Sequence, residues 1–507
     1  MQSMFSKRYP QDLPTAQGVA VKFSRLVFPV LFLLAVLGQS YGETSRVSPV
    51  DRTQLVAWLT GGISNTRLAR LAAERGVSFA VSAADEKQLR AVGADSALVK
   101  ALRTAHHGPD SKAGCPPALY KAAELARAKK YDAAAGQLTN LLRSDSENSS
   151  LHFALGQMLL EQEQFDAAMD EFTESARLMP GFPETHSRLA YLFYRSDDSE
   201  NTIGEARSAL SMDPGNAEAY RYLGLGLFGT GKSYAALHAY EQSLIREPES
   251  PDAYYDIGIA RREVGDLRGA MVAYRHALRI KNDFWEAHSN LGVVLHDLGR
   301  LDEAVVEYRE AKRLAPDESS VRNNLGNTYC DKGEYDAAIS EFRELYRQDA
   351  GWDGGHACMA QAFMVKKDYA SAIVELRQTV LQNPTGASEH RVLGQALVLA
   401  GKPEEALKEL QAAVYLAPDS AIAHHYLGTA LFETESFDQA EKEFREAVRL
   451  EPTAQNHYSL AACLMATGHN DEALAELENA SRLDPAQNLY RARKEELLKV
   501  MAQPSHQ

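Results

Sequence analysis

Cysteine is scarce in this sequence, with four residues among 507. Cys115, Cys330, Cys358 and Cys463 form no CxxC pair, so the common zinc and redox motifs are excluded. Three of the four fall in predicted helices, where a thiol packs as a small apolar group. Cys330 and Cys358 lie in neighbouring helices about six positions out of step, an offset near 9 Å along nearly parallel helices, which is too far for a disulfide. We expect free, mostly buried thiols.

Dense basic runs are absent downstream of residue 42, and the formal net charge is −15 at pH 7. A nucleic-acid groove needs clustered lysine and arginine, so nucleic acid is excluded as a partner. The acidic balance of the whole chain favours partners that are basic or neutral.

Apolar runs are short. Leu26–Gly38 (residues 26–38) spans about 13 residues, whereas a helix that crosses a bilayer needs about 20. Lys22 and Arg25 precede this run, and Ser40–Gly42 supplies small residues for cleavage, which is typical of a secretory signal peptide. We expect residues 1–42 to be removed and the chain to be exported, periplasmic or secreted. Without cleavage, the same run would anchor it to the inner membrane.

What the chain has in abundance is a repeated unit, seen most clearly in Glu286–Pro316. Prolines that close this unit are spaced by 34 residues or twice that number, and a last one follows 33 residues later; they are Pro180, Pro214, Pro248, Pro316, Pro384, Pro418, Pro452 and Pro485. Because 507 residues are too many for one compact core, this period predicts an extended array.

Each unit reads as two helices. Leu291, Gly292 and Leu295 share one face of the first helix, and Ala304, Tyr308 and Ala311 share one face of the second. These residues and the closing Pro316 lie at the spacings of the tetratricopeptide repeat, which the chain resembles. The resemblance implies an all-α fold, a right-handed α-solenoid of antiparallel helix pairs.

The predicted domain organisation follows from this period. Before the array, four short helices are expected at about 49–60, 65–75, 83–92 and 96–105. Ala350 replaces a closing proline and glycines surround Trp352, so we hypothesise a soft joint at 350–355. The expected segments are a signal peptide (1–42), a small helical N-terminal module (43–106), a linker (107–114), about eleven repeats (115–487), and a C-terminal capping helix with a tail (488–507).

One stretch imitates a phosphate-binding loop. Gly226–Ser233 matches GxxxxGK[ST], the pattern of nucleotide-binding proteins. Such a loop must follow a strand, whereas the preceding residues here form the first helix of a repeat. Gly231 falls at the turn between the two helices, and Gly224 falls where the helices touch. Nucleotide binding is therefore kept only as an alternative.

Histidine recurs at the fourth position of seven repeats: His152, His186, His288, His356, His390, His424 and His457. Neighbouring helices lie 8–10 Å apart, so successive histidines cannot share a zinc ion. Because Tyr220 and Tyr254 fill the same position, we expect a structural role in which a flat ring packs there. No catalytic signature is present, and we expect no enzyme activity, no cofactor and no metal.

The resemblance also implies where partners bind. In the family, positions five, six and nine of each repeat line a concave groove that grips peptides, and Asn290 and Asn324 match its ladder of asparagines. The lysine and arginine set of the family's carboxylate clamp is not matched. We expect a non-catalytic scaffold that binds protein or peptide segments, or alternatively a membrane-tethered assembly factor for cell-envelope machinery. The implied groove residues are Tyr222, Tyr255, Asp256, Asn290, Asn323, Asn324, Asn327, Gln361, Arg391, Gln395 and His425.

Overall fold

The computed structural model describes residues 48–108, 114–349 and 351–502, and its regular elements there are helices. Isolated β-bridges join Val50 to Val77 and Val77 to His107. The predicted signal peptide, most of the linker and the tail from Gln503 lie outside the described residues. No helix in the described ranges is long and apolar enough to cross a membrane.

Contacts divide the chain into two compact units. The first takes in the residues up to Ser146 together with Phe153–Gln162, and the second takes in Glu147–His152 and everything from Glu163. The first unit holds α1 (Arg52–Thr60), α2 (Asn65–Arg75), α3 (Ala83–Ala91), α4 (Ser96–Thr104), α5 (Pro117–Arg127), α6 (Tyr131–Leu142) and most of α7 (Ser149–Glu161).

Local capping explains the four short helices of the first unit. Ser64 accepts a hydrogen bond from the Arg67 amide at the start of α2, and Asp95 caps α4 in the same way. Ser82 and Asp85 form a capping box at the start of α3. The helix expected from about residue 49 begins later, since α1 starts after Asp51, where Asp51 and Gln54 make a capping box.

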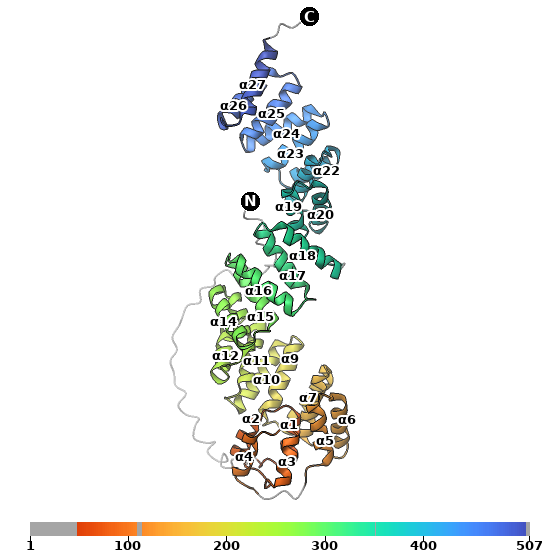
Figure 1. Ribbon diagram of the computed structural model, residues 1–507, viewed down its shortest axis with the longest axis vertical. Coiled ribbons are helices and arrows are strands. Elements are labelled where there is room, and N and C mark those ends of the chain that lie inside the picture. Colours follow the sequence, from red (N-terminus) through yellow and green to blue (C-terminus); the bar gives the residue numbers. More distant parts are fainter. Residues whose placement is uncertain (1–47, 109–113, 350, 503–507) are drawn as a thin grey trace, which may run out of the picture. The chain divides into compact units, whose positions relative to one another are not determined.

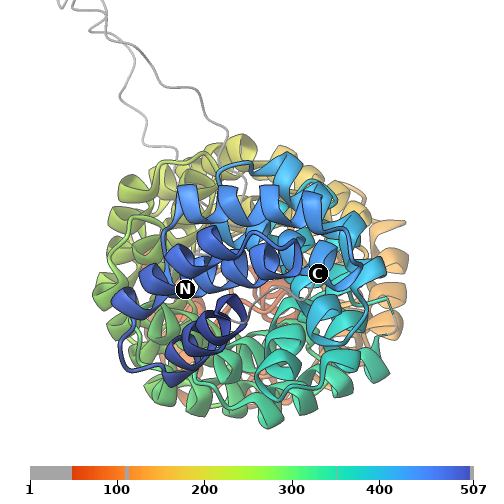
Figure 2. The same ribbon diagram turned by 90° about the horizontal axis from the view of Figure 1, so that it is seen from above.

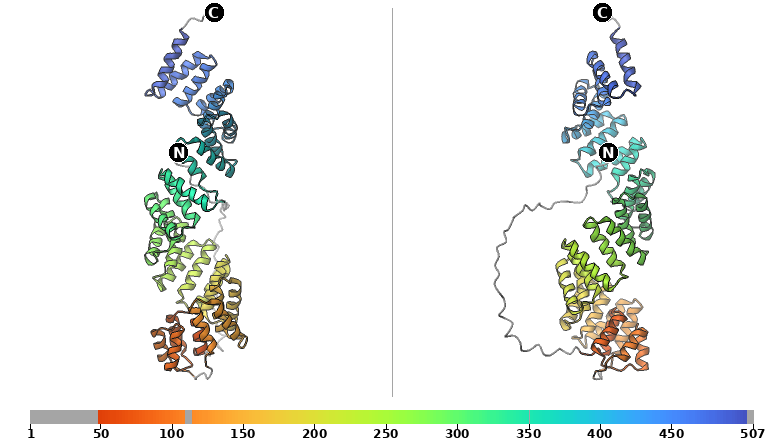
Figure 3. Two further views of the ribbon diagram at one scale, coloured as in Figure 1. Left: turned by 45° about the vertical axis from the view of Figure 1, so that its right-hand side comes forward. Right: turned by 90° about the vertical axis from the view of Figure 1, so that its left-hand side faces the viewer.

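The second unit is a series of antiparallel helix pairs, which confirms the predicted all-α solenoid (Figures 1 and 3). Seen from above, the pairs of this unit follow one another around a common axis (Figure 2). Its helices are α8 (Phe165–Leu178), α9 (Pro183–Arg195), α10 (Ser199–Met212), α11 (Ala217–Gly229), α12 (Ser233–Arg246), α13 (Pro251–Glu263), α14 (Leu267–Ile280), α15 (Trp285–Asp297), α16 (Leu301–Leu314), α17 (Ser319–Asp331), α18 (Tyr335–Gln348), α19 (His356–Val365), α20 (Tyr369–Gln382), α21 (Ala387–Leu399), α22 (Pro403–Leu416), α23 (Ala421–Glu433), α24 (Phe437–Leu450), α25 (Ala454–Ala466), α26 (Asn470–Leu483) and α27 (Asn488–Met501).

Two glycines make the pairing of α15 with α16 possible. Gly299, between α15 and α16, has φ of +72°, a conformation that L side chains rarely adopt. Gly292 lies against the ring of Tyr308, and a Cβ atom there would be 2.7 Å from the Tyr308 Cε1 atom. The turn therefore needs a backbone without steric restriction, and the helix contact needs a residue without a side chain.

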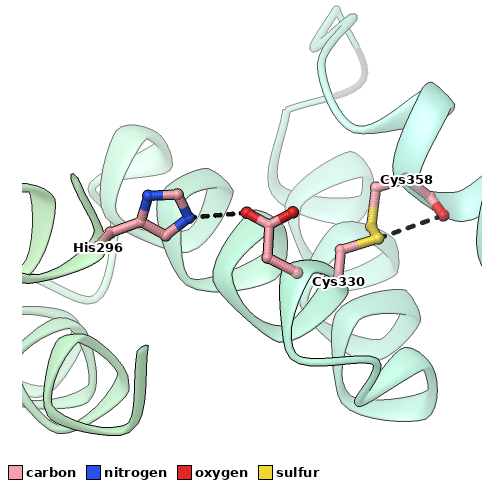
Figure 4. Close-up of a disulfide and its surroundings, with 4 residues drawn as sticks. His296, Cys330 and Cys358 are labelled. Carbon is pink, nitrogen blue, oxygen red and sulfur yellow. Dashed lines mark hydrogen bonds and ion pairs between the residues drawn. A yellow bond between two sulfur atoms is a disulfide. The ribbon is translucent and has the colours of Figure 1, made fainter. Parts of the chain in front are cut away.

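The step from α17 to α19 differs from the other steps. Helix α19 has 10 residues, whereas α17 has 13, and it begins after Gly355, whose φ is +88°. Cys330 on α17 and Cys358 on α19 form a disulfide with a Cα–Cα distance of 6.0 Å (Figure 4). The prediction that these two cysteines stay free was therefore wrong, whereas Cys115 and Cys463 are free.

The error came from the assumed register. We placed neighbouring first helices side by side in step, but the side chains that meet across them are separated by more than the repeat period in some pairs, such as Arg221 and Asp256 at 35 residues, and by less in others. Arg188 pairs with Glu218 at a separation of 30 residues, shorter than the repeat period. The disulfide spans 28 residues, so a cysteine near the end of α17 meets one near the start of α19.

Candidate protein-binding face

The first helices of successive repeats lie against one another through most of the second unit. We call the surface formed by positions five, six and nine of the repeats whose first helices are α9, α11, α13, α15, α17, α19, α21, α23 and α25 the first-helix face. All the predicted groove residues belong to it. Their surroundings divide this face into two parts, α9–α15 and α17–α25.

In the part from α9 to α15, charged side chains are paired within the chain. The Arg188 guanidinium donates to the Glu218 carboxylate at 2.6 Å, and Arg221 donates to Asp256 at 2.5 Å. The Arg221 guanidinium also lies 4.0 Å from the Asp252 carboxylate. These ion pairs join α9 to α11 and α11 to α13.

Two predicted groove residues are buried in these seams. Asp256 is 5% exposed and Tyr222 is 6% exposed. Burial raises the pKa of Asp256 to about 6, and the Arg221 guanidinium opposes that rise. Burial also raises the pKa of Tyr222, and the Glu218 carboxylate adds to this effect. Both side chains serve contacts between repeats, so the prediction that they face a partner is not supported by their positions.

Asn290 also has a partner inside the array. Its amide donates to the Tyr255 hydroxyl at 2.9 Å, which links α13 to α15. Tyr255 packs against the Phe284 ring, with the ring centroids 4.9 Å apart. Burial raises the pKa of Tyr255 to about 12, so its hydroxyl stays protonated. Asn290 therefore differs from Asn324, with which the sequence grouped it.

In the part from α17 to α25, most of the predicted residues lack side-chain partners among the described residues. Six of them are partly or fully exposed, and their side chains make no hydrogen bond or ion pair there: Asn323, Asn324, Asn327, Gln361, Arg391 and Gln395. His425 is partly buried, and its Nδ1 atom has no partner. Burial lowers the pKa of His425, which keeps the ring neutral, and the Asn456 side chain opposes this shift.

The seven repeated histidines lie behind this face and bridge the two helices of their repeats. Each Nδ1 atom lies 2.5–2.7 Å from a glutamate Oε2 atom 19 residues later. This agrees with the predicted structural role, but the reason is a hydrogen bond rather than the packing of a flat ring. The sequence carried a signal that we missed. Every histidine at this position has glutamate 19 residues later, whereas Tyr220 and Tyr254 have Ala239 and Ala273.

The phosphate-loop pattern lies in a helix, a turn and the start of a second helix. Gly226 lies inside α11, Gly231 forms the turn with φ of +74°, and Ser233 begins α12. A Cβ atom on Gly226 would be 2.8 Å from the Ile203 side chain, so this glycine serves packing. The arrangement differs from the strand, loop and helix that cradle a phosphate.

A pocket of about 450 Å³ lies in the first unit, lined by Arg52, Asp85, Cys115, Tyr120, Lys121 and neighbouring residues. Burial raises the pKa of the Cys115 thiol to about 12, so it is a poor nucleophile at neutral pH. Arg52 and Asp85 are paired with each other across this pocket. Over the described part of the chain, no three His, Cys, Asp or Glu side chains are grouped as metal ligands would be.

Stacked antiparallel helix pairs with direct contacts between neighbouring first helices define a helical-repeat protein. Models of the tetratricopeptide repeat match residues 121–181, 260–299, 285–318, 319–347, 359–421 and 426–488. Together these matches cover more than half of the sequence. The chain belongs to the tetratricopeptide repeat family, whose fold generally serves as a non-catalytic scaffold that binds proteins.

Solved structures similar to the chain include MamA, at 25% identity over 32% of this chain and 94% of that chain, with a TM-score of 0.29. PilF from Pseudomonas aeruginosa is 16% identical over 44% of this chain and 98% of that one, with a TM-score of 0.38. Tom70 from yeast is 16% identical over 75% of this chain and 93% of that one, with a TM-score of 0.30. No curated protein sequence matches the chain.

Proposed function

We propose that this chain is an exported, non-catalytic scaffold that binds protein or peptide segments along its first-helix face. The observation that carries the proposal is the set of polar side chains on α17–α23 without partners among the described residues. Asn323, Asn324 and Asn327 come from consecutive turns of α17, and Gln361 and Gln395 follow on α19 and α21. A side-chain amide can donate and accept at once, which suits the backbone of an extended segment.

The two parts of the face would have different tasks. From α9 to α15, ion pairs such as Arg188–Glu218 join neighbouring repeats and hold the helices in place. From α17 to α25, the partly exposed amides would supply many modest contacts to a partner. Binding by a prearranged surface loses little conformational entropy, so such contacts can add up to useful affinity.

Export rests on two observations of different kinds. The pattern in residues 1–42 is that of a secretory signal peptide. The Cys330–Cys358 disulfide is a bond that persists in oxidising compartments and is rare in the cytosol. Both point to a periplasmic or secreted protein. Sequencing the amino terminus of the chain from a fractionated cell tests this. A start near Glu43 is expected, and an intact terminus in the membrane fraction would favour the tethered alternative.

Partner binding is tested with the full chain as bait in an envelope extract, followed by titration of each purified candidate. Asn324→Ala combined with Asn327→Ala should weaken binding about tenfold, because two neutral hydrogen bonds contribute about 1 kcal/mol together or somewhat more. Gln411→Ala, an exposed amide on the second helix α22, is the matched control and should have no effect. Equal binding by all three proteins would contradict the use of this face.

A further inference from the structure

We propose that Arg391 is the anchor for a carboxylate side chain of an acidic peptide segment that binds across α19–α25. The inference rests on the proposed function and adds to it the chemistry of the partner. It starts from three arginines on the first-helix face. Arg188 and Arg221 have carboxylate partners on the next first helix, whereas Arg391 has no hydrogen bond or ion pair among the described residues.

The repeat itself supplies the comparison. Arg221 and Arg391 are both at the fifth position of their repeats, so the residues they face on the next first helix are equivalent. Arg221 faces Asp252 and Asp256, which are 31 and 35 residues later. At the same separations from Arg391 stand Ile422 and Tyr426. Both acidic residues that satisfy Arg221 are therefore missing opposite Arg391.

Without these carboxylates, the Arg391 guanidinium is partly buried and has no counter-charge beside it. Arg391 is only partly exposed, and burial lowers its pKa, an effect that Tyr426 opposes. Burial lowers the pKa of Arg221 too, but Asp256, Asp252 and Tyr222 together raise it above its ordinary value. A half-buried guanidinium without a counter-charge gains much from a carboxylate, which it can bind through two parallel hydrogen bonds.

The side chains around Arg391 indicate that the partner carries a negative charge at this point. At positions five, six and nine of α17, α19, α21, α23 and α25, Arg391 is the one charged side chain. The rest are amides, hydroxyls, the neutral His425 and apolar side chains. The net charge of −15 favours basic partners for the chain as a whole. However, exposed charges are screened beyond about 8–10 Å, so Arg391 sets the preference on this part of the face.

A single cation among neutral side chains also indicates which kind of anion binds. Nucleic acids and other polyanions are held by several lysines and arginines that neutralise successive phosphates. One guanidinium with amides beside it, such as Gln395 one turn later on α21, instead matches one acidic side chain in an otherwise neutral segment. Tyr426 and Tyr458 are partly exposed on the next two first helices and would pack against apolar neighbours of that acid.

The test is a selection of displayed random peptides of about 12 residues on the immobilised full chain. The wild-type protein should enrich peptides with Asp or Glu at one recurring position. Arg391→Gln should lose this enrichment, and Arg391→Glu should replace it with Lys or Arg. Arg268→Glu makes the same charge change at an exposed, unpaired position on α14, and its pool should match that of the wild type.

Affinities of one selected peptide then measure the contact directly. Changing its acidic residue to the amide should weaken binding to the wild type about 10- to 100-fold, the range of one charge-assisted hydrogen-bond pair. The same change should have little effect on binding to Arg391→Gln, and Arg391→Lys should recover part of the affinity. Because the peptide substitution leaves the protein unaltered, a folding defect in a variant cannot imitate this result.

Three outcomes would count against the proposal. Wild-type pools without an acidic bias, or an equal bias with Arg391→Gln, would overturn the role of Arg391 and leave the proposed peptide binding intact. If the Arg268→Glu variant also loses the preference for acidic peptides, the preference comes from long-range electrostatic attraction rather than from a contact with Arg391. Failure of every protein to enrich any peptide would overturn this inference and the proposed function together.

Discussion

Cys330 and Cys358 are joined by a disulfide beside the connection between α18 and α19, which is longer than the other connections between helix pairs in the second unit (Figure 4). Next to Cys330, Asp331 accepts a hydrogen bond from the His296 Nε2 atom at 2.7 Å. Three successive first helices, α15, α17 and α19, are thereby tied together by one hydrogen bond and one covalent bond. The predicted soft joint thus lies beside a covalent link that restrains it.

The first prediction concerns this link. Replacing Cys330 and Cys358 by serine should lower the free energy of unfolding by about 3–4 kcal/mol, because the disulfide closes a loop of about 30 residues in the unfolded chain. Amide hydrogen exchange from Asp349 to α19 should become faster, since the glycines there no longer have a bridge beside them. Urea unfolding and hydrogen exchange measure the two effects.

Reduction supplies the control for this experiment. Dithiothreitol should reproduce the effect in the wild-type chain and should do nothing to the double serine variant, which retains the free Cys115 and Cys463. Exchange that is unchanged by reduction would show that the connection is held by packing alone, and the soft joint would then be refuted.

The second prediction concerns His186 and Glu205. The His186 Nδ1 atom lies 2.6 Å from the Glu205 carboxylate, and its Nε2 atom lies 3.3 Å from the Pro180 carbonyl oxygen. Both ring nitrogens face acceptors, so the doubly protonated ring fits the site. The hydrogen bond to Glu205 raises the pKa of His186, although burial opposes it.

A raised folded-state pKa fixes the sign of the pH dependence. The stabilisation by His186 should be complete below the unfolded pKa of about 6.5 and should be lost as the pH rises through the folded value. A double-mutant cycle with His186→Gln and Glu205→Gln should give a coupling of about 1–2 kcal/mol at pH 6 and much less at pH 9. A coupling that grows with pH would contradict this assignment.

Much of the fold could be predicted from the sequence, because its information is local. The period, the turn glycines and the small residues at helix contacts determine each pair, and Gly292 beneath Tyr308 is such a contact. The disulfide could not be predicted, since it depends on how far one first helix is displaced along the next. That displacement is set by the packing of several repeats and has no residue pattern of its own.

The candidate site was predicted less well for a related reason. Position in the repeat identifies which side chains belong to the first-helix face, but it does not tell whether a neighbour satisfies them. Asp256 and Arg391 have similar repeat positions, yet Asp256 is buried in an ion pair and Arg391 is unpaired. Comparing the residues 31 and 35 positions later would have separated Arg221 from Arg391, because the two carboxylates that Arg221 contacts stand at those separations.

The third prediction tests the helix-contact glycines. Gly292→Ala would place a Cβ atom 2.7 Å from the Tyr308 ring. We expect the free energy of unfolding to fall by about 1–3 kcal/mol, the usual cost of overpacking, despite the better helix propensity of alanine. Gly204→Ala is the matched control, since it lies within α10 with nothing within 4 Å of the added atom, and it should be stabilising by about 0.5–1 kcal/mol. Thermal unfolding of both variants measures these effects. A loss of stability in both variants would indicate that the cause is the backbone rather than the contact with Tyr308.

The fourth prediction concerns the stretch that imitates a phosphate loop. Lys232 is exposed immediately before α12, where it follows a helical turn rather than a strand, and the backbone amides of α11 are engaged in the helix. No arc of free amides surrounds a phosphate position beside it, so the geometry lacks what makes such loops bind nucleotides. Titration of labelled ATP with magnesium should show no saturable binding to the wild type, and Lys232→Ala should give the same trace. Binding that saturates and depends on Lys232 would require α11 to unwind at Gly226–Gly229, and the repeat around it would have to open for that loop to form.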